Sequence, residues 1–226
     1  MRMKPIEPSI VYEDNHLIAV NKPFGMLSQG DETGDQSVFE WVKEYIRITY
    51  NKPGNVYLAL LHRLDRPTGG VLLLAKTSKA ASRMSQQFQS RAIQKVYVAL
   101  TESVPNPPVG TLKHHLKKLG GKNIMRAYHK EVAHSKPASL DYRLKRSANA
   151  KALIEVQPKT GRRHQIRVQL ASIGCTIRGD VKYGKTSFNP DKSICLFAQK
   201  LIFNHPVTKE KITIEAPLPQ LDWWQL

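Results

Sequence analysis

A single carboxylate stands among basic side chains in the stretch His62-Arg63-Leu64-Asp65-Arg66. A carboxylate held beside cations stays ionised, and an ionised Asp can act as a nucleophile. Asp is also common in turns, because it hydrogen-bonds the nearby backbone, and Pro67 and Gly69-Gly70 follow this one directly. The stretch by itself therefore leaves two interpretations of Asp65 open, a reactive group or a structural turn anchor.

Two apolar runs flank this polar loop, Val56–Leu61 before it and Val71–Ala75 after it. Runs of that length bounded by turn residues are typical of buried strands. Pro67 and the Gly69-Gly70 pair predict a turn between the two strands. The sequence thus places Asp65 in a loop between two core strands.

A second basic stretch, Thr160–Arg167, combines a Thr-Gly break with three arginines and a histidine. The spacing of Ile166, Leu170 and Ile173 predicts a helix, on which Arg163 and Arg167 lie one turn apart. Such a density of cations favours an anionic partner, and a solvated basic helix face is the alternative.

The whole chain is strongly basic, with 35 Lys and Arg against 18 Asp and Glu in 226 residues and a net charge of +17. Nucleic acid is the leading partner for such a chain, an anionic membrane comes second, and a merely soluble basic surface is the plain alternative. No apolar run approaches the roughly 20 residues that span a bilayer. We therefore expect a nucleic-acid partner and no membrane.

The N-terminal residues and the two cysteines indicate a cytoplasmic protein. Residues 1–8 contain no apolar segment of the kind that secretory signals carry. Cys175 and Cys195 lack CxxC spacing and are expected to be free thiols in a reducing compartment. The histidines between residues 103 and 138 lack the spacing of zinc ligands, so no metal is expected.

The remaining elements predict an α+β fold with a mixed, largely antiparallel sheet flanked by helices and loops. Residues 103–138, rich in Pro, Gly and Lys, are predicted to be an irregular basic excursion that contacts phosphate. We expect a single domain over residues 1–226. The other predicted elements are a hairpin over 9–22, a helix after Ser37 with a capping box to Glu40, a helix over 77–92, strands over 94–100, 138–146, 152–156, 193–198 and 200–203, and a final hairpin returning over 212–216.

Five motifs in register make the chain resemble the RluA-like RNA pseudouridine synthases. They are Asn21–Gly25, His62–Asp65 followed by Thr68–Val71, Lys95–Ala99, Thr160–Arg167 and His205–Thr208. The resemblance covers about residues 9–219 and implies the pseudouridine synthase catalytic fold. Because the first strand begins near Ser9, we expect no separate N-terminal RNA-binding domain.

This family isomerises uridine in RNA to pseudouridine by detaching uracil and rejoining it through a ring carbon. The resemblance implies that Asp65 is the essential carboxylate, that Arg167 pairs with it, and that Tyr97 packs on the target base. Without the resemblance, Tyr97 would be interpreted as an aromatic residue that packs within the sheet. An enzyme of this kind must extrude its base from a duplex, and Arg63 would fill the gap. Whether Asp65 attacks the sugar or the ring stays open. The other expected RNA-binding residues are His62, Arg66, Thr68, Arg162, Arg163, His164, Gln165 and Ile166.

The chemistry needs no redox change or phosphate transfer, so we expect no cofactor. The partner is expected to be transfer or ribosomal RNA, and the Arg66-Pro67-Thr68 spelling resembles the branch that acts on transfer RNA. We expect a monomer, because no apolar helix face is left over. The alternatives are a non-catalytic RNA-binding protein on the same scaffold, and a hydrolase with paired carboxylates, for which the motifs hold no second acidic residue.

Overall fold

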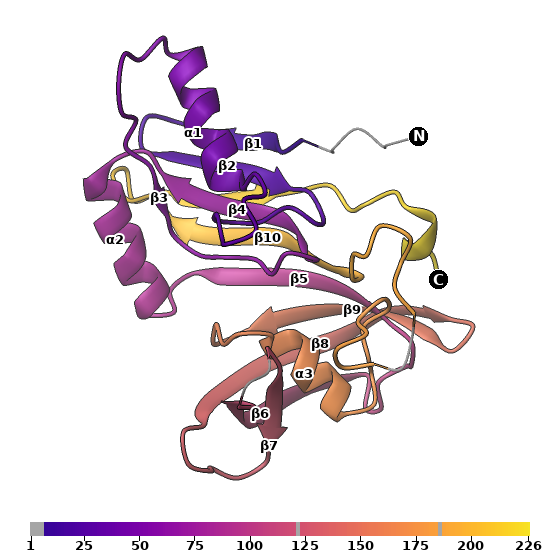
Figure 1. Ribbon diagram of the computed structural model, residues 1–226. Coiled ribbons are helices and arrows are strands. Elements are labelled where there is room, and N and C mark those ends of the chain that lie inside the picture. Colours follow the sequence, from indigo (N-terminus) through magenta and orange to yellow (C-terminus); the bar gives the residue numbers. More distant parts are fainter. Residues whose placement is uncertain (1–6, 121–122, 185–186) are drawn as a thin grey trace. The chain divides into compact units, whose positions relative to one another are not determined.

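The computed structural model describes residues 7–120, 123–184 and 187–226, which belong to two compact units (Figure 1). Unit 1 comprises Met1–Ile93 and Ala198–Pro217, and unit 2 comprises Gln94–Phe197 and Leu218–Leu226. The expected single domain over residues 1–226 stays a prediction. The first six residues, on which part of the argument against a secretory signal rests, lie outside the described residues.

Unit 1 is a mixed, mostly antiparallel sheet with two helices (Figure 1). Its strands follow the order β1-β2-β4-β10, with β3 on β4 and β11 on β10. Figure 1 shows β4 and β10 side by side although they are far apart in the sequence. The elements are β1 (Ser9–Glu13), β2 (Leu17–Lys22), α1 (Val38–Thr49), β3 (Ala59–Leu60), β4 (Gly69–Ala75), α2 (Ser78–Gln89), β10 (Leu196–Asn204, in this unit from Ala198 on) and β11 (Lys211–Glu215).

The core of unit 1 forms around β4, which is buried along its whole length, as its apolar run predicted. The predicted capping box of α1 is also confirmed: the Ser37 side chain accepts from the Glu40 amide, and the Glu40 carboxylate accepts from the Ser37 amide. This cap turns the amphipathic face of α1 inward, so that Val38, Val42 and Ile46 are buried.

Two predictions next to the Asp65 loop were wrong in detail. The run Val56–Leu61 forms a strand only at Ala59–Leu60, because β2 pairs with β4 over six residues and β10 neighbours β4 as well. The Gly69-Gly70 pair does not make the turn but begins β4. Gly70 is required there, since it has a φ of +112° and a Cβ on it would lie 2.2 Å from the Ala198 carbonyl oxygen.

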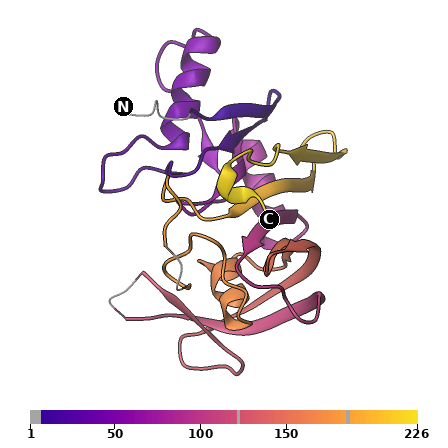
Figure 2. The ribbon, with the colours of Figure 1, turned by 90° about the vertical axis from the view of Figure 1, so that its right-hand side faces the viewer.

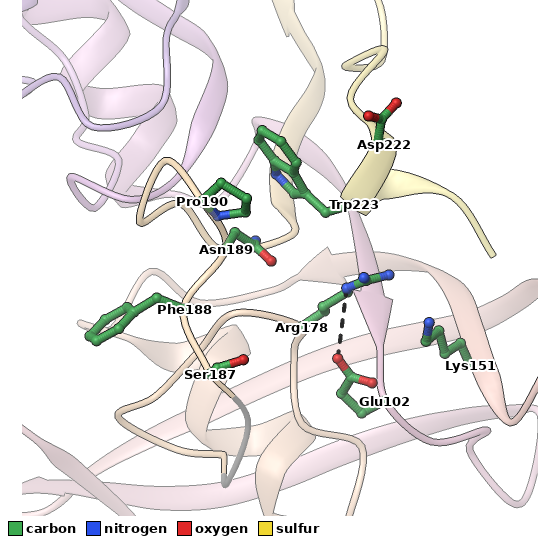
Figure 3. Close-up of a pocket in the computed structure, with 9 residues that line it drawn as sticks. All are labelled: Glu102, Lys151, Arg178, Ser187, Phe188, Asn189, Pro190, Asp222 and Trp223. Carbon is green, nitrogen blue, oxygen red and sulfur yellow. Dashed lines mark ion pairs between the residues drawn. The ribbon is translucent and has the colours of Figure 1, made fainter. Parts of the chain in front are cut away.

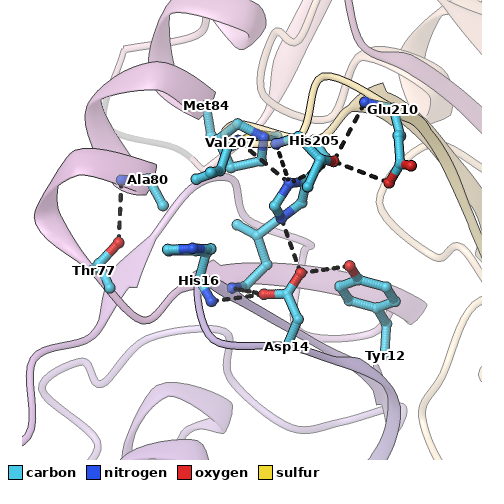
Figure 4. Close-up of polar contacts among 12 residues, drawn as sticks. Tyr12, Asp14, His16, Thr77, Ala80, Met84, His205, Val207 and Glu210 are labelled. Atoms are coloured by element: carbon cyan, nitrogen blue, oxygen red, sulfur yellow. Dashed lines mark hydrogen bonds and ion pairs between the residues drawn. The ribbon is translucent and has the colours of Figure 1, made fainter.

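Two hairpins of unit 1 are held together by a buried histidine (Figure 4). The predicted hairpin over 9–22 is confirmed, and its turn residue Asp14 accepts from the Tyr12 hydroxyl at 2.6 Å. His205, at the turn between β10 and β11, places Nε2 2.9 Å from Asp14 Oδ2 and accepts the Thr208 amide on Nδ1 at 3.0 Å. The final hairpin is thereby fixed to the first.

Unit 2 is a five-stranded antiparallel sheet with one helix on it. The strand order is β5-β9-β8-β6-β7, and Figure 2 shows α3 lying against this sheet. Trp224 packs edge-on against Phe197. The elements are β5 (Gln94–Thr101), β6 (Val109–Lys118), β7 (Met125–Tyr128), β8 (Lys136–Ala148), β9 (Lys151–Pro158), α3 (Gln165–Ser172) and the 3-10 helix η1 (Asp222–Trp224).

The prediction of an irregular excursion over 103–138 was wrong, because β6, β7 and the start of β8 are regular strands. Leu112, His114 and Leu116 are buried and alternate with basic residues on the other face of β6. This period of two is a strand signal that the many charges and the flanking Pro and Gly residues concealed. Gly121 and Lys122, which the prediction included, lie outside the described residues.

The predicted α+β class is confirmed. The strands predicted over 138–146 and 152–156 form as the antiparallel pair β8 and β9, with Asn149 and Ala150 in left-handed backbone conformations at the turn. One further boundary was wrong, since the two short strands predicted over 193–203 are the single strand β10. Among the described residues no helix is long and apolar enough to cross a membrane.

Candidate active site

The loop that carries Asp65 joins β3 to β4 in unit 1 and is held through its backbone. The Ser28 hydroxyl donates to the Leu64 carbonyl at 2.8 Å and accepts from the Leu64 amide at 3.0 Å, both within the interior. The Thr68 amide donates to the Asp65 carbonyl at 2.9 Å, which closes the turn at Arg66-Pro67. Asp65 itself is half-buried.

His62, predicted to contact RNA, has a structural partner in the sheet. Its Nε2 accepts the Leu73 amide of β4 at 3.0 Å, and its ring stacks on Phe88 of α2 at a centroid distance of 5.2 Å. Leu73 lies just beyond the two residues that pair β4 with β3, so its amide meets a side chain at that point. His62 therefore anchors the start of the loop.

Lys22 is a fully buried lysine behind the loop. Its ammonium group donates to the carbonyls of Pro23 at 3.1 Å, Met26 at 2.6 Å and Arg66 at 3.1 Å, and so links two loops. Burial lowers the pKa of Lys22 to about 7, and the charge of Asp65 opposes this shift. The sequence analysis quoted this residue within the Asn21–Gly25 motif but gave it no role.

The arginines beside Asp65 are exposed. Arg66 donates from Nε to the Gly25 carbonyl at 2.9 Å, accepts the Gly25 amide on its own carbonyl at 2.9 Å, and pairs with Asp35 at 2.5 Å. Thr68, in contrast, is buried, so its predicted contact with RNA is less accessible than that of Arg63 or Arg66.

In unit 2, Arg167 of α3 forms a buried bidentate ion pair. Its Nε and Nη2 donate to the two carboxylate oxygens of Asp180 at 2.6 and 2.7 Å, and both residues are at most 4% exposed. The Asp180 carboxylate also accepts the Lys182 amide at 3.1 Å. A fork of this kind fixes the plane of the guanidinium group.

Tyr183 connects Arg167 to His164 at the start of α3. The ring of Tyr183 lies 5.3 Å from the Arg167 guanidinium carbon, and its hydroxyl lies 2.8 Å from His164 Nδ1. The same hydroxyl accepts the Met125 amide of β7 at 2.8 Å. His164 is buried and takes a left-handed backbone conformation with φ of 51°.

The other residues of the Thr160–Arg167 motif divide by exposure. Gln165 is buried, accepts from the Thr160 hydroxyl at 2.7 Å and donates to the Ser139 carbonyl at 3.0 Å, and Ile166 is buried beside it. Arg163 is exposed, and Arg162 is partly exposed with its Nε on the Pro137 carbonyl. Contact with RNA is therefore most accessible to the two arginines.

Tyr97 is half-buried on β5, directly opposite Val156 of β9. Lys95, two residues earlier on the same face, has its ammonium group close to the exposed Gly161. Burial lowers the pKa of Lys95. This strand thus carries a basic group and an aromatic ring toward the Thr160–Arg167 motif.

The predicted catalytic residues belong to different units, Asp65 to unit 1 and Tyr97 and Arg167 to unit 2. The pairing of Arg167 with Asp65 stays a prediction. Sequence reasoning missed Lys22, Asp180 and Tyr183 as supporting residues, although an Asp after a Gly in the turn-rich segment was a signal for Asp180. The described residues contain no cluster of three side chains suited to a metal ion.

A separate hollow of about 590 Å³ lies in unit 2 and contains none of the predicted site residues (Figure 3). Arg178 and Glu102 face each other in it at 3.9 Å. Because charges of both signs line this hollow, it does not select an anion by charge. Its lining residues are Glu102, Lys151, Arg178, Ser187, Phe188, Asn189, Pro190, Asp222 and Trp223.

Comparison with known proteins gives consistent matches. Residues 16–172 match the sequence profile of the family described as RNA pseudouridylate synthase. Ribosomal large subunit pseudouridine synthase C of Buchnera aphidicola subsp. Acyrthosiphon pisum is 32% identical over 216 residues, covering 92% of this chain and 67% of that protein. The protein of the same name from Rickettsia prowazekii is 33% identical over 212 residues, covering 93% and 68%.

Solved structures agree with these matches. The structure of human RNA pseudouridylate synthase domain containing 4 superposes with a TM-score of 0.77 at 26% identity, covering 93% of this chain and 88% of that one. The family profile extends over more than half of the chain, and its start and end enclose Asp65, Tyr97 and Arg167. The chain therefore belongs to the RNA pseudouridylate synthase family, in agreement with its RluA-like motifs, and is an RNA-modifying isomerase.

Proposed function

We propose that this enzyme isomerises uridine in the RNA of the large ribosomal subunit. The two relatives from Buchnera and Rickettsia are named for that substrate and are similar over more than nine-tenths of this chain. This outweighs the weaker likeness of the Arg66-Pro67-Thr68 spelling to the branch that acts on transfer RNA. The net charge of +17 suits a large polyanionic substrate.

Asp65 is the residue to which we assign the essential chemistry. The observation that carries this assignment is the support of its loop, whose backbone is bound on both sides of Asp65 by the buried side chains Ser28 and Lys22. A reacting group needs this kind of preorganised position. The isomerisation breaks the bond between uracil and the sugar and forms a carbon–carbon bond in its place, and Asp65 acts on the detached or detaching nucleotide.

Arg167, Tyr97 and Arg63 would complete the site. Asp180 holds Arg167 through Nε and Nη2, and the guanidinium group held in this way would pair with the Asp65 carboxylate and keep it ionised. Tyr97 would pack on the target base, and the exposed Arg63 would stack where the flipped nucleotide had been. Arg66, Arg162 and Arg163 would contact phosphate. These groups would be supported by the half-buried His62 and by four buried residues, Thr68, His164, Gln165 and Ile166.

We further infer a cytoplasmic monomer that needs neither metal nor cofactor. The reaction has no net redox change, and the two thiols, Cys175 and Cys195, are both free and buried. Addition of a chelator should leave turnover unchanged.

The decisive experiment replaces Asp65 by Asn and maps pseudouridine by carbodiimide-adduct primer extension. Ribosomal RNA from cells that lack the gene is the substrate, with transfer RNA from the same cells as the comparison. We expect Asp65→Asn to abolish pseudouridine formation while RNA binding survives. Asp141→Asn is the matched control, because it removes the same charge from an exposed site.

Two results would contradict the proposal. Turnover of Asp65→Asn at the wild-type rate would remove Asp65 from its catalytic role and favour another carboxylate. Modification of transfer RNA alone by the wild-type enzyme would refute the ribosomal substrate. A wild-type protein that binds both RNAs and modifies neither would support the non-catalytic alternative.

A further inference from the structure

One face of the β6–β7 hairpin in unit 2 gathers basic and aromatic side chains. Strand alternation and register put five residues on this side, which we call the outer basic face: Lys113, His115, Lys117, Arg126 and Tyr128. Lys117 lies opposite Arg126, and His115 lies opposite Tyr128. Lys113 and Arg126 are exposed, and the others are partly exposed.

The opposite face of the same strands is fixed against α3. Leu116, Ala138 and Val168 form a buried cluster there, with Met125 and Ala127 packed against it. A one-residue change of register would bury the cations and expose these apolar side chains, so the register is strongly specified. The outer basic face is therefore a lasting feature of the fold.

The cations of this face are in excess over the acidic groups beside them. Among the described residues no ion pair involves Lys113, Lys117 or Arg126. The nearby Asp141 is engaged by Lys159 at 2.9 Å and by the Thr111 hydroxyl at 2.7 Å. Hydrogen bonds from these two residues, together with the charges of Lys159 and Lys113, lower the pKa of Asp141. One carboxylate shared in this way leaves an excess of positive charge on the face for an external anion.

The aromatic residues indicate which kind of anion this face would bind. The Arg126 guanidinium carbon lies 5.4 Å from the centre of the Tyr128 ring, a cation–π contact that keeps the arginine beside the aromatic face. Cations at every second residue of a strand recur at about 6.6 Å, and they stand here beside aromatic faces. Phosphates with neighbouring unstacked bases are the ligands that this combination fits.

The face also points away from the residues assigned to catalysis in unit 2. Tyr97 pairs with Val156, and Val156 pairs with Tyr142, whose side chain shares the buried face of β8 with Leu140 and Ala138. Tyr97 and α3 therefore belong to one face of the sheet, and Lys113 and Arg126 belong to the other. We therefore expect that a short RNA bound at Tyr97 does not reach both.

We propose that the outer basic face binds a second segment of the RNA substrate, separate from the segment that carries the target uridine. This inference rests on the proposed function, since it takes RNA as the substrate. The second segment adds affinity for long structured RNA, because two contacts on one molecule act together.

The test measures binding in an Asp65→Asn background, so that turnover does not change the RNA. One protein carries Lys113→Gln, Lys117→Gln and Arg126→Gln, and the matched control carries the same charge loss at three exposed lysines of unit 1, Lys52→Gln, Lys79→Gln and Lys211→Gln. Both are titrated with a long fragment of ribosomal RNA and with a short hairpin cut from it around the target uridine, over a range of salt concentrations.

For the long RNA, the protein with the three substitutions on the outer basic face should differ from the control in its salt dependence. We expect the magnitude of its slope of log K against log salt to be smaller by about 2 to 3, since each lost phosphate contact contributes about 0.7 to 0.9. Its affinity should fall at least tenfold below that of the control. For the short hairpin the loss should be several times smaller. Urea unfolding of both proteins should agree with that of the parent, because substitutions at exposed sites change stability little.

Equal slopes for the control and for the protein with substitutions on the outer basic face would overturn the inference. An acidic protein partner would then be the better explanation of the positive charge on this face. An equal loss on long and short RNA would overturn it as well, because the face would then contact the target segment. Absence of pseudouridine with the wild-type enzyme would instead refute the proposed function, which this binding test does not measure.

Discussion

Replacement of Lys22 by Met tests how the Asp65 loop is supported. Methionine fills a similar volume but removes the ammonium group that bonds the carbonyls of Pro23, Met26 and Arg66. The Arg66 carbonyl keeps the Gly25 amide as a donor, whereas the other two lose their bond to Lys22. A buried polar group left without its partner costs about 1 to 3 kcal/mol. At neutral pH this loss is offset in part, because the buried charge is also removed.

The pH dependence of the free energy of unfolding gives a larger effect that is specific to Lys22. Burial lowers the pKa of Lys22 from 10.5 to about 7 in the folded protein. Between these values the unfolded state binds one proton more than the folded state, so stability rises with pH by about 1.4 kcal/mol per pH unit. Below about pH 7 both states are protonated, and the cost of the buried charge is present in full. From pH 7 to pH 10 the wild type should therefore gain about 3 to 4 kcal/mol over Lys22→Met.

Urea unfolding at pH 6, 7, 8, 9 and 10 measures this difference for the two proteins. Other titrating groups are common to both, so they cancel in the difference. Lys52→Met, at an exposed lysine, is the control and should give a difference that stays flat with pH. A flat difference for Lys22→Met as well would refute the reasoning, since it would mean that Lys22 is charged in the folded state over the whole range.

Two further substitutions test contacts that fix the site. Gly70→Ala should lower the free energy of unfolding of unit 1 by about 3 kcal/mol or more, as measured by urea unfolding. The added Cβ would meet the Ala198 carbonyl oxygen at 2.2 Å, in a backbone with positive φ. Gly54→Ala is the control: its φ is also positive but no atom lies near its Cβ, so the loss of stability should be clearly smaller. Asp180→Asn should lower the free energy of unfolding by about 3 to 5 kcal/mol, because it removes one partner of a buried ion pair. Asp141→Asn, at an exposed ion pair, should lower it by under about 1 kcal/mol. Equal losses in the two proteins would contradict the supporting role of the Arg167–Asp180 pair.

Local sequence signals predicted much of the fold and failed where a distant strand decided the outcome. The capping box at Ser37 and Glu40 involves residues three apart, so it could be read directly. The length of β3 depends on which strands already border β4, and the requirement for Gly70 depends on Ala198, more than a hundred residues away. Neither pairing leaves a trace in the local sequence.

The supporting residues of the candidate site were hidden for a similar reason. Arg167 was predicted from its motif, but its carboxylate partner Asp180 lies outside every motif, in a turn without apolar periodicity. Lys22 was within a motif, yet a lysine in a polar stretch is ordinarily exposed. Its burial follows from three carbonyls that converge only after both loops have folded. Sequence spacing finds residues that do chemistry more readily than residues that hold them.

The contacts of the Asp65 loop lead to one further expectation for its replacement. Ser28 binds the Leu64 backbone and Lys22 binds the Arg66 carbonyl, so buried side chains hold the main chain on both sides of Asp65. The Asp65 carbonyl accepts the Thr68 amide at 2.9 Å, a main-chain bond that a change of the side chain leaves in place. Because these supports do not depend on the charge of residue 65, we expect Asp65→Asn to keep the loop folded in urea unfolding, whereas its proposed catalytic role predicts the loss of turnover.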